Sequence, residues 1–439
     1  MVKNSIAIVA ASYNGKKESD KFVGLLEKQT IADKFDIIIV DNGSTDGTYE
    51  HLTSKYGKYD NLIILRAKEN YGVSGGFCIG GMYAYDKGYE YIIYADNDAY
   101  AISNNLIEEL VRNCDVKTVT FGLEAQDNYP EIKSEYIDTV LPYHYFCIHK
   151  KGIEKVGFPY FYYFLGFDDS DYTYNILKNN LKILRLNYVR YSHSKKSLIA
   201  GREIDYILAP MSRFLFVIRN QFLYFIRASP NYFIYMLKSI FGVSVFFIYF
   251  LLGFRYLFYS CFRCFFDFLF NVYDNKQYLS TNKKHKMKVS YLNYSEFNRK
   301  YGEKFIILDS DDYLLNKLNI PNLNSNIDDL DIKKFKEFFR IFIKSFNKNV
   351  IIGNSTSAKT VFSMIFFKEI YIKSIRTETE NGFYFLKIKN NFRWIKILLL
   401  ILMDILILPI LFLILSLKFI FYRNVDNIKS YKPYLIEKK

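Results

Sequence analysis

Short apolar runs alternate with helical stretches along the first hundred residues, and this alternation constrains the fold more than any other feature of the sequence. It predicts a parallel sheet covered by helices on both faces, in one α/β unit over residues 1–225. The predicted strands are Ile6–Ala11, Ile37–Val40, Leu62–Leu65, Tyr91–Ala95, Thr118–Gly122 and Tyr145–His149. Helices are predicted between the first four strands and over Ser170–Asn179.

The composition is that of a folded chain of two or three domains. Of the 439 residues, 50% are apolar and 24% are charged, which excludes a disordered chain. The five cysteines are odd in number and scattered, so we expect reduced thiols in a cytosolic setting. The net charge of +14 suits an anionic membrane surface, a phosphorylated substrate or a nucleic acid. Because no nucleic-acid-binding module is recognisable, we expect no nucleic-acid partner.

Two apolar segments predict an α-helical, membrane-associated C-terminal region. Ser239–Phe254 is uncharged but short for a span, which favours aromatic amphipathic helices at the membrane interface over residues 226–274. Ile397–Leu417 is long enough to cross the roughly 30 Å hydrocarbon core, so residues 391–424 are predicted to form a transmembrane helix. A re-entrant hairpin is the alternative, because Asp404–Pro409 puts a charge and a helix breaker at mid-depth.

The other segments of the second half carry no recognisable motif. Residues 275–390 are polar and charged and are predicted to form an accessory region of unknown fold, and residues 425–439 form a basic tail. Cys261 and Cys264 make a C-x-x-C pair, but their apolar, aromatic neighbours favour packing over a zinc or redox role.

Polar residues and glycines follow directly after the first two predicted strands. Ser12-Tyr13-Asn14-Gly15 follows the first strand, and the run from Asp41 to Thr48 follows the second. The carboxyl ends of parallel strands share one edge of a sheet, where open α/β folds bind their ligands. The two loops therefore predict a ligand crevice.

Two further loops extend this edge. Asn70–Gly76 is glycine-rich and opens a helix, so its backbone amides can approach an anion closely. It lacks the P-loop pattern and follows the third strand, which is against a dinucleotide fingerprint. Asp96-Asn97-Asp98 follows the next strand, and its two carboxylates offer oxygen ligands to Mg²⁺ or Mn²⁺.

In order and spacing, these four motifs resemble the family-2 inverting glycosyltransferases of the GT-A fold, in particular their rhamnosyltransferase and galactofuranosyltransferase-like branch. An acidic pair in Phe167–Tyr172 and the histidine of Tyr191-Ser192-His193 follow downstream, as in that family. The resemblance implies a Rossmann-like GT-A domain of the nucleotide-diphospho-sugar transferase type over residues 1–225. Cys78 and Asn175 depart from the branch, which usually has Asn and often Arg there, and they bear on donor identity more than on reaction class.

The resemblance also implies a role for each motif residue. Asp169 would be the general base, with Asp168 as the second choice that otherwise orients the acceptor. A Mn²⁺ or Mg²⁺ ion, held by Asp96, Asp98 and His193, would neutralise charge on the leaving nucleoside diphosphate. Donor-binding residues would be Ser12, Tyr13, Asn14, Asp41, Asn70, Gly72, Gly75, Gly76, Asp96 and Asn97. The acceptor would be bound by Tyr162, Tyr163 and Asp168.

The implied function is metal-dependent, inverting transfer of a hexosyl or deoxyhexosyl group from a UDP-, dTDP- or GDP-sugar. The acceptor would be a lipid-linked or cell-surface glycan, as in polysaccharide biosynthesis for the cell envelope. Because nucleotide sugars are cytosolic, we expect a membrane-associated protein whose catalytic domain faces the cytoplasm. Two alternatives stay open at this point: a nucleotidyltransferase, and a catalytically inactive membrane scaffold that binds nucleotide or glycan.

Overall fold

The computed structural model divides the chain into two units, which are described separately. The first contains Met1–Ser197, Ile226–Ala228 and Arg423–Lys439, and the second contains Leu198–Phe225 and Ser229–Tyr422. Within them the structure describes residues 4–125, 134–138, 140, 142–193, 211–229, 231–251, 255–270, 289–293, 305–307, 350–353, 369–373, 382–389, 399, 402, 410–420 and 427–436.

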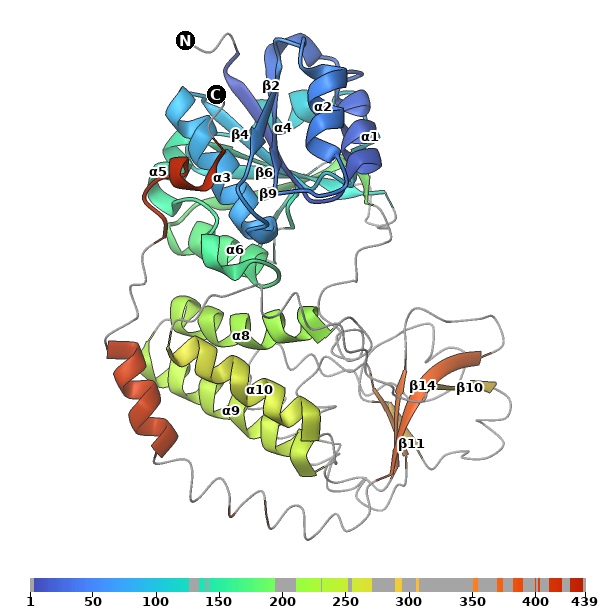
Figure 1. Ribbon diagram of the computed structural model, residues 1–439, viewed down its shortest axis with the longest axis vertical. Helices are drawn as coiled ribbons and strands as arrows, with labels where there is room; N and C mark the ends of the chain where they lie inside the picture. The colour runs from blue at the N-terminus through green and yellow to red at the C-terminus, as the bar shows by residue number, and fades with distance from the viewer. Residues whose placement is uncertain are drawn as a thin grey trace. The chain divides into compact units, whose positions relative to one another are not determined.

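The first unit contains the predicted α/β sheet (Figure 1). Its strand order is β3-β2-β1-β4-β8-β6-β9-β5, with β7 paired to β9. The strands are β1 (Ile6–Ser12), β2 (Phe35–Asp41), β3 (Leu62–Arg66), β4 (Tyr91–Ala95), β5 (Ala99–Ala101), β6 (Thr118–Glu124), β7 (Ser134–Ile137), β8 (His144–His149) and β9 (Lys182–His193).

The prediction of a parallel sheet is correct for β1 to β4 and for the pair β6–β9, but wrong for β5, β7 and β8, which pair only antiparallel. The pairs β2–β3, β1–β2 and β1–β4 are parallel, whereas β8 runs antiparallel to both β4 and β6. β8 is buried along almost its whole length, so its sequence shows no alternation that could reveal strand direction.

Helices cover both faces of this sheet, as the alternation predicted. They are α1 (Lys16–Leu26), α2 (Thr48–Tyr56), α3 (Gly72–Lys87), α4 (Leu106–Asn113), α5 (Lys150–Val156) and α6 (Asp168–Lys178). Alternate side chains of β1 point into two hydrophobic cores on opposite faces of the sheet. Ile8 packs with Phe22 of α1 in one core, and Val9 packs with Phe77 of α3 in the other.

Glycines allow α3 to lie unusually close to the sheet. A Cβ atom on Gly80 would overlap the Val9 side chain and lie 3.1 Å from Cγ2 of Val40, and one on Gly76 would lie 2.5 Å from Cβ of Ala11. The apolar residues of α3 therefore pack directly on β1 and β2, which fixes the position of the loop that opens the helix.

Residues 427–436 also belong to the first unit and lie beside α3, as the red segment near the C-terminus shows (Figure 1). They include a 3₁₀ turn, η4 (Lys432–Tyr434), and a bridge that joins Leu435 to Ala67. Tyr431 is buried against α3. The segment that the sequence indicated only as a basic tail thus packs on the α/β unit.

The second unit contains helices and a separate sheet. Its helices include most of α8 (Met211–Ala228), α9 (Tyr232–Leu251), α10 (Arg255–Leu269) and a helix over residues 410–420. Its sheet has the order β10-β14-β13-β12-β11 and mixes parallel with antiparallel pairs. The strands are β10 (Val289–Asn293), β11 (Phe305–Ile307), β12 (Val350–Gly353), β13 (Glu369–Lys373) and β14 (Gly382–Lys389).

The described residues contain no helix that is both long and apolar enough to cross a membrane. Most of the predicted span at Ile397–Leu417, and most of residues 275–390, lie outside the described residues. All five cysteines, Cys261 and Cys264 included, are buried and outside any disulfide.

The contact between α3 and the sheet gives a stability prediction. Gly80→Ala should destabilise the protein by about 1–3 kcal/mol, because the new methyl group has no room beside Val9. The matched control is Gly24→Ala on α1, where no atom lies within 4 Å of the new Cβ. There the higher helix propensity of alanine should raise the free energy of unfolding by about 0.5–1 kcal/mol. Thermal unfolding of both variants measures the difference, and equal melting temperatures would contradict the argument.

Candidate active site

The loops after β1 and β2 meet at the carboxyl edge of the sheet, as expected. The backbone N–H of Asn14 donates to Oγ of Ser44 (2.9 Å), and the N–H of Thr45 donates to Oδ1 of Asn14 (2.8 Å). Asn14 adopts a positive φ of 50°, which its short polar side chain tolerates. Asn14 therefore joins the two loops.

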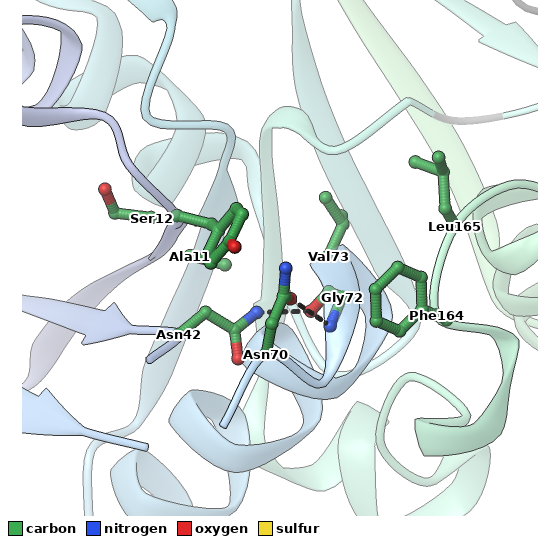
Figure 2. A pocket seen from close by; sticks show the side chains of 9 residues that line it. Ala11, Ser12, Asn42, Asn70, Gly72, Val73, Phe164 and Leu165 are labelled. Carbon is green, nitrogen blue, oxygen red and sulfur yellow. Dashed lines mark hydrogen bonds between the residues drawn. The ribbon is translucent and has the colours of Figure 1, made fainter. Parts of the chain in front are cut away.

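A pocket with a volume of about 140 Å³ opens beside these loops (Figure 2). Four of the predicted donor residues line it, and the sequence analysis assigned no role to the remaining five. The predicted residues are Ser12, Tyr13, Asn70 and Gly72, and the others are Ala11, Asn42, Val73, Phe164 and Leu165.

Asn42 fixes the glycine-rich loop at the pocket. Its Nδ2 donates to the carbonyl of Gly72 (2.7 Å), and its Oδ1 accepts from the N–H of Tyr71 (3.1 Å). Oδ1 of Asn70 accepts from the N–H of Gly72 (2.8 Å), and Figure 2 shows these side chains converging on Gly72. A single amide side chain after β2 thus determines the shape of the loop after β3.

Gly72 also has no room for a side chain. Its φ is +75°, and a Cβ atom there would overlap the backbone carbonyl of Phe164. Gly75 and Gly76 lie one turn further along α3, where a Cβ would meet Tyr71 and Ala11 respectively. All three predicted loop glycines therefore serve close packing around the pocket.

Two further predicted donor residues, Asp41 and Asn97, are not among the residues that line the pocket. Asp41 is completely buried, and this burial raises the pKa of its carboxyl group, with nearby Ser44 acting in the opposite direction. Nδ2 of Asn97 donates to the hydroxyls of Ser12 (3.2 Å) and Ser19 (3.0 Å), so the loop after β4 is bonded to the end of β1.

Asp96, His144 and His193 form a cluster that could hold a metal ion. One ligand atom from each lies within 4.8 Å of the other two. Nε2 of His144 lies 3.2 Å from Oδ2 of Asp96, and the two imidazole rings stack with centroids 4.1 Å apart. Asp98 lies outside the three-residue cluster, and its Oδ1 is 3.0 Å from Nε2 of His193.

Three strand ends bring this cluster together. Asp96 follows β4, His144 begins β8 and His193 ends β9. A register shift between Tyr94 and Ala95 brings His144 opposite Ala95. Sequence reasoning proposed Asp96, Asp98 and His193; of these the structure places Asp96 and His193 in the cluster. It missed His144, because the proximity of that residue depends on this irregular antiparallel pairing.

The cluster holds a mixed set of ligands. Burial alone would lower the pKa of His193, but the hydrogen bond to Asp98 and the charges of Asp98 and Asp96 raise it on balance. One carboxylate and two imidazoles form a nitrogen-rich donor set, which suits Mn²⁺ better than Mg²⁺. The residues present therefore fit a transition-metal ion.

The acidic pair begins α6, two residues before the predicted start of that helix at Ser170. The backbone before it is strained, because Phe164 and Phe167 both adopt a positive φ (65° and 66°). Burial raises the pKa of Asp168 well above its usual range, and the charges of Asp169 and Asp96 add to the shift. Burial likewise raises the pKa of Asp169, with His144 opposing the shift and Asp96 adding to it. The pair thus lies within electrostatic reach of the metal-binding cluster.

Arg227 supports the first turn of α6. Its guanidinium makes two hydrogen bonds of 3.0 Å to the carboxylate of Asp171, and it lies 3.7 Å from the ring centroid of Tyr160.

Of the predicted acceptor residues, Tyr163 is fully buried and Tyr162 is half-buried.

Residues 7–151 match glycosyl transferase family 2. This third of the chain is therefore a glycosyltransferase domain, and the match supports a glycosyltransferase activity. No curated protein matches the chain.

Several solved structures are similar to this chain. TarS from S. aureus has a TM-score of 0.37 and 16% identity, covering 55% of this chain and 43% of TarS. GalNAc-T7 with UDP, GalNAc and Mn²⁺ has a TM-score of 0.37 and 14% identity, covering 43% and 44% of the two chains. Mannosyltransferase PcManGT from Pyrobaculum calidifontis, in complex with GDP-Man and Mn²⁺, has a TM-score of 0.40 and 13% identity, covering 60% and 74%. The chain spans less than half the length of the first two.

The cluster gives a metal-binding prediction. Asp96→Ala and His144→Ala should each weaken Mn²⁺ binding about tenfold or more, because each removes one of three ligands. His51→Ala is the matched control, since His51 lies on α2 and pairs with Asp20. Calorimetric titration with Mn²⁺ measures the affinities. Unchanged binding by His144→Ala would instead favour the predicted set of Asp96, Asp98 and His193.

Proposed function

We propose that this chain transfers a sugar from a nucleotide-sugar donor to an acceptor hydroxyl, in a metal-dependent reaction that inverts the anomeric centre. The observation that carries the proposal is the acidic pair of Asp168 and Asp169, which lies within electrostatic reach of Asp96 and His144 in the unit whose residues 7–151 match glycosyl transferase family 2. The family match favours sugar transfer over the nucleotidyltransferase alternative.

The donor nucleotide would occupy the pocket between the loops after β1, β2 and β3. Ser12, Asn42 and Asn70 offer hydroxyl and amide groups there, and Tyr13 is half exposed beside them. The start of α3 adds backbone amides and the positive end of the helix dipole, both of which favour a diphosphate. We propose a UDP-, dTDP- or GDP-linked hexose or deoxyhexose, as the rhamnosyltransferase and galactofuranosyltransferase-like branch would use.

Asp96, His144 and His193 would hold the divalent ion, with Asp98 orienting His193 through its hydrogen bond. When bound, the ion supplies positive charge that offsets the charge developing on the leaving diphosphate. The two histidines make Mn²⁺ the preferred ion over Mg²⁺.

Asp169 would take the proton from the acceptor hydroxyl as the hydroxyl oxygen attacks the anomeric carbon. Burial makes Asp169 a stronger base than an exposed aspartate, because it raises the pKa of the carboxyl group. One base is sufficient, because a single displacement forms no covalent intermediate with the protein. Asp168 would orient the acceptor or, as the alternative, act as the base itself.

Replacing the base tests this function. Asp169→Asn should lower the transfer rate by about 10²–10⁴-fold while leaving nucleotide binding nearly intact, because the amide cannot accept the proton. Asp168→Asn distinguishes the two carboxylates, and Asp60→Asn, at an exposed site before β3, is the control. The assay measures sugar transfer from UDP-, GDP- and dTDP-sugars to glycan acceptors. Full activity in Asp169→Asn would exclude Asp169 as the base.

We also propose that the protein acts at a membrane surface with its catalytic domain facing the cytoplasm, where a lipid-linked acceptor would be available. The support is an apolar stripe on the helix over residues 410–420, where Ile410, Leu413, Leu417 and Ile420 are 46–69% exposed at helical spacing. The opposite face contributes buried Leu415 and the ammonium of Lys418, which donates to the carbonyl of Leu269 (3.1 Å). A stripe of this kind fits the apolar layer below lipid headgroups.

Vesicle flotation tests this placement. The full chain should float with vesicles containing anionic lipid, and Leu413→Asp with Leu417→Asp should reduce the floated fraction at least tenfold, because carboxylates resist burial below headgroups. Ile102→Asp, at an exposed apolar residue of the first unit, should float like the unmodified protein. Equal flotation of all three proteins would show that the helix over residues 410–420 does not bind the membrane.

A further inference from the structure

We propose that Asn427 is a positioning residue for the nucleotide pocket, acting through the segment 158–165. The inference rests on the proposed function, because it concerns the pocket assigned to the donor. Asn427 lies far from the pocket residues in sequence, 266 positions after its hydrogen-bond partner Phe161. It nevertheless belongs to the same compact unit.

The amide of Asn427 bonds to the backbone of this segment in both directions. Its Nδ2 donates to the carbonyls of Pro159 (3.0 Å) and Phe158 (3.4 Å), and its Oδ1 accepts from the N–H of Phe161 (3.0 Å). These groups lie outside any sheet and at the start of a short 3₁₀ turn, η2 (Phe161–Tyr163), so a side chain has to satisfy them. Asn427 therefore fixes the path of the chain just before the pocket wall.

Aromatic packing holds the same turn from the same side. The ring of Tyr434 lies 4.7 Å from that of Phe161 and 5.2 Å from that of Tyr71, and the last two are 5.3 Å apart. Each pair lies in the range of favourable aromatic contacts. Tyr71 directly precedes Gly72, so this cluster joins the glycine-rich loop to η2.

Backbone bonds anchor the C-terminal segment to the sheet edge. The carbonyl of Tyr434 accepts from the N–H of Lys68 (2.9 Å), and the N–H of Ile436 donates to the carbonyl of Arg66 (2.8 Å). The segment thus continues the hydrogen bonding of the sheet beyond β3. It is held independently of the turn that it supports.

The turn is held from the other side by α3. The hydroxyl of Ser74 donates to the carbonyl of Tyr160, and Phe164 packs its backbone against Gly72. Phe164 and Leu165, which follow η2, then form one wall of the pocket opposite Ser12 and Asn42 (Figure 2). Because the segment lies between α3 and Asn427, losing the Asn427 amide should release this wall.

The test measures nucleotide affinity in the full-length protein. Asn427→Ala should bind the nucleotide preferred by the unmodified protein, among UDP, GDP and dTDP with Mn²⁺, about tenfold more weakly. Asn427→Asp keeps the acceptor for Phe161 but places a carboxylate oxygen against the carbonyls of Pro159 and Phe158, so it should also weaken nucleotide binding. Lys429→Ala, at an exposed residue of the same segment, should bind like the unmodified protein. A merely stabilising contact would lower the melting temperature and leave the affinity of the folded protein unchanged, which would overturn the inference.

Hydrogen exchange separates the two proposals. The amide of Phe161 should exchange at least tenfold faster in Asn427→Ala than in Lys429→Ala, because its acceptor is gone. Equal exchange would overturn the positioning role whatever the nucleotide result. If the unmodified protein binds none of the three nucleotides, the proposed function fails, and the exchange rate alone decides whether Asn427 positions the wall. If Asn427→Ala does not fold, Tyr434→Ala is the second variant: it removes the ring that packs on Phe161 and should weaken nucleotide binding about tenfold, although the amide of Phe161 keeps its acceptor.

Discussion

The close approach of α3 to β1 is the constraint on which the rest of the first unit depends. Gly76 and Gly80 allow the helix backbone to reach the sheet at the level of Ala11 and Val9, where any larger residue would overlap them. The first turn of α3 is thereby fixed beside the end of β1, within hydrogen-bond reach of Asn42. A helix that lay farther from the sheet would leave the loop without this bond, and the pocket without its shape.

The same helix explains why the C-terminal segment returns to this unit. α3 is apolar around most of its circumference, and a helix of that kind has to be buried on more than one side. Phe77 and Ala84 face the sheet, whereas Cys78 and Met82 pack with Tyr431 of the C-terminal segment. Burial of that second side removes apolar surface from water, and the same contact brings Asn427 to η2.

The apolar alternation predicted the strands β1 to β4, the helices between them and the loops at the sheet edge, because those features depend on neighbouring residues. His144 was not predictable, since its proximity to Asp96 results from an antiparallel pairing with a register shift. Nor was the placement of Asn427, because nothing in a polar, basic stretch indicates which turn it will join. Asn42 belonged to a motif that the sequence analysis recognised, yet its bonds to Tyr71 and Gly72 link two loops and became visible only in the fold.

The charges at the sheet edge relate the metal-binding cluster to the base. Burial and the charge of Asp96 raise the pKa values of both Asp168 and Asp169, the charge of Asp169 adds to the shift of Asp168, and His144 opposes the shift of Asp169. A divalent cation among Asp96, His144 and His193 adds positive charge on the same side, so it favours the ionised form of Asp169. If the chain functions as proposed, metal binding and the readiness of Asp169 to accept a proton would therefore be coupled through space. The segment before α6 joins the two parts of the site, because Phe164 lines the pocket and Phe167, which also has a positive φ, directly precedes the acidic pair.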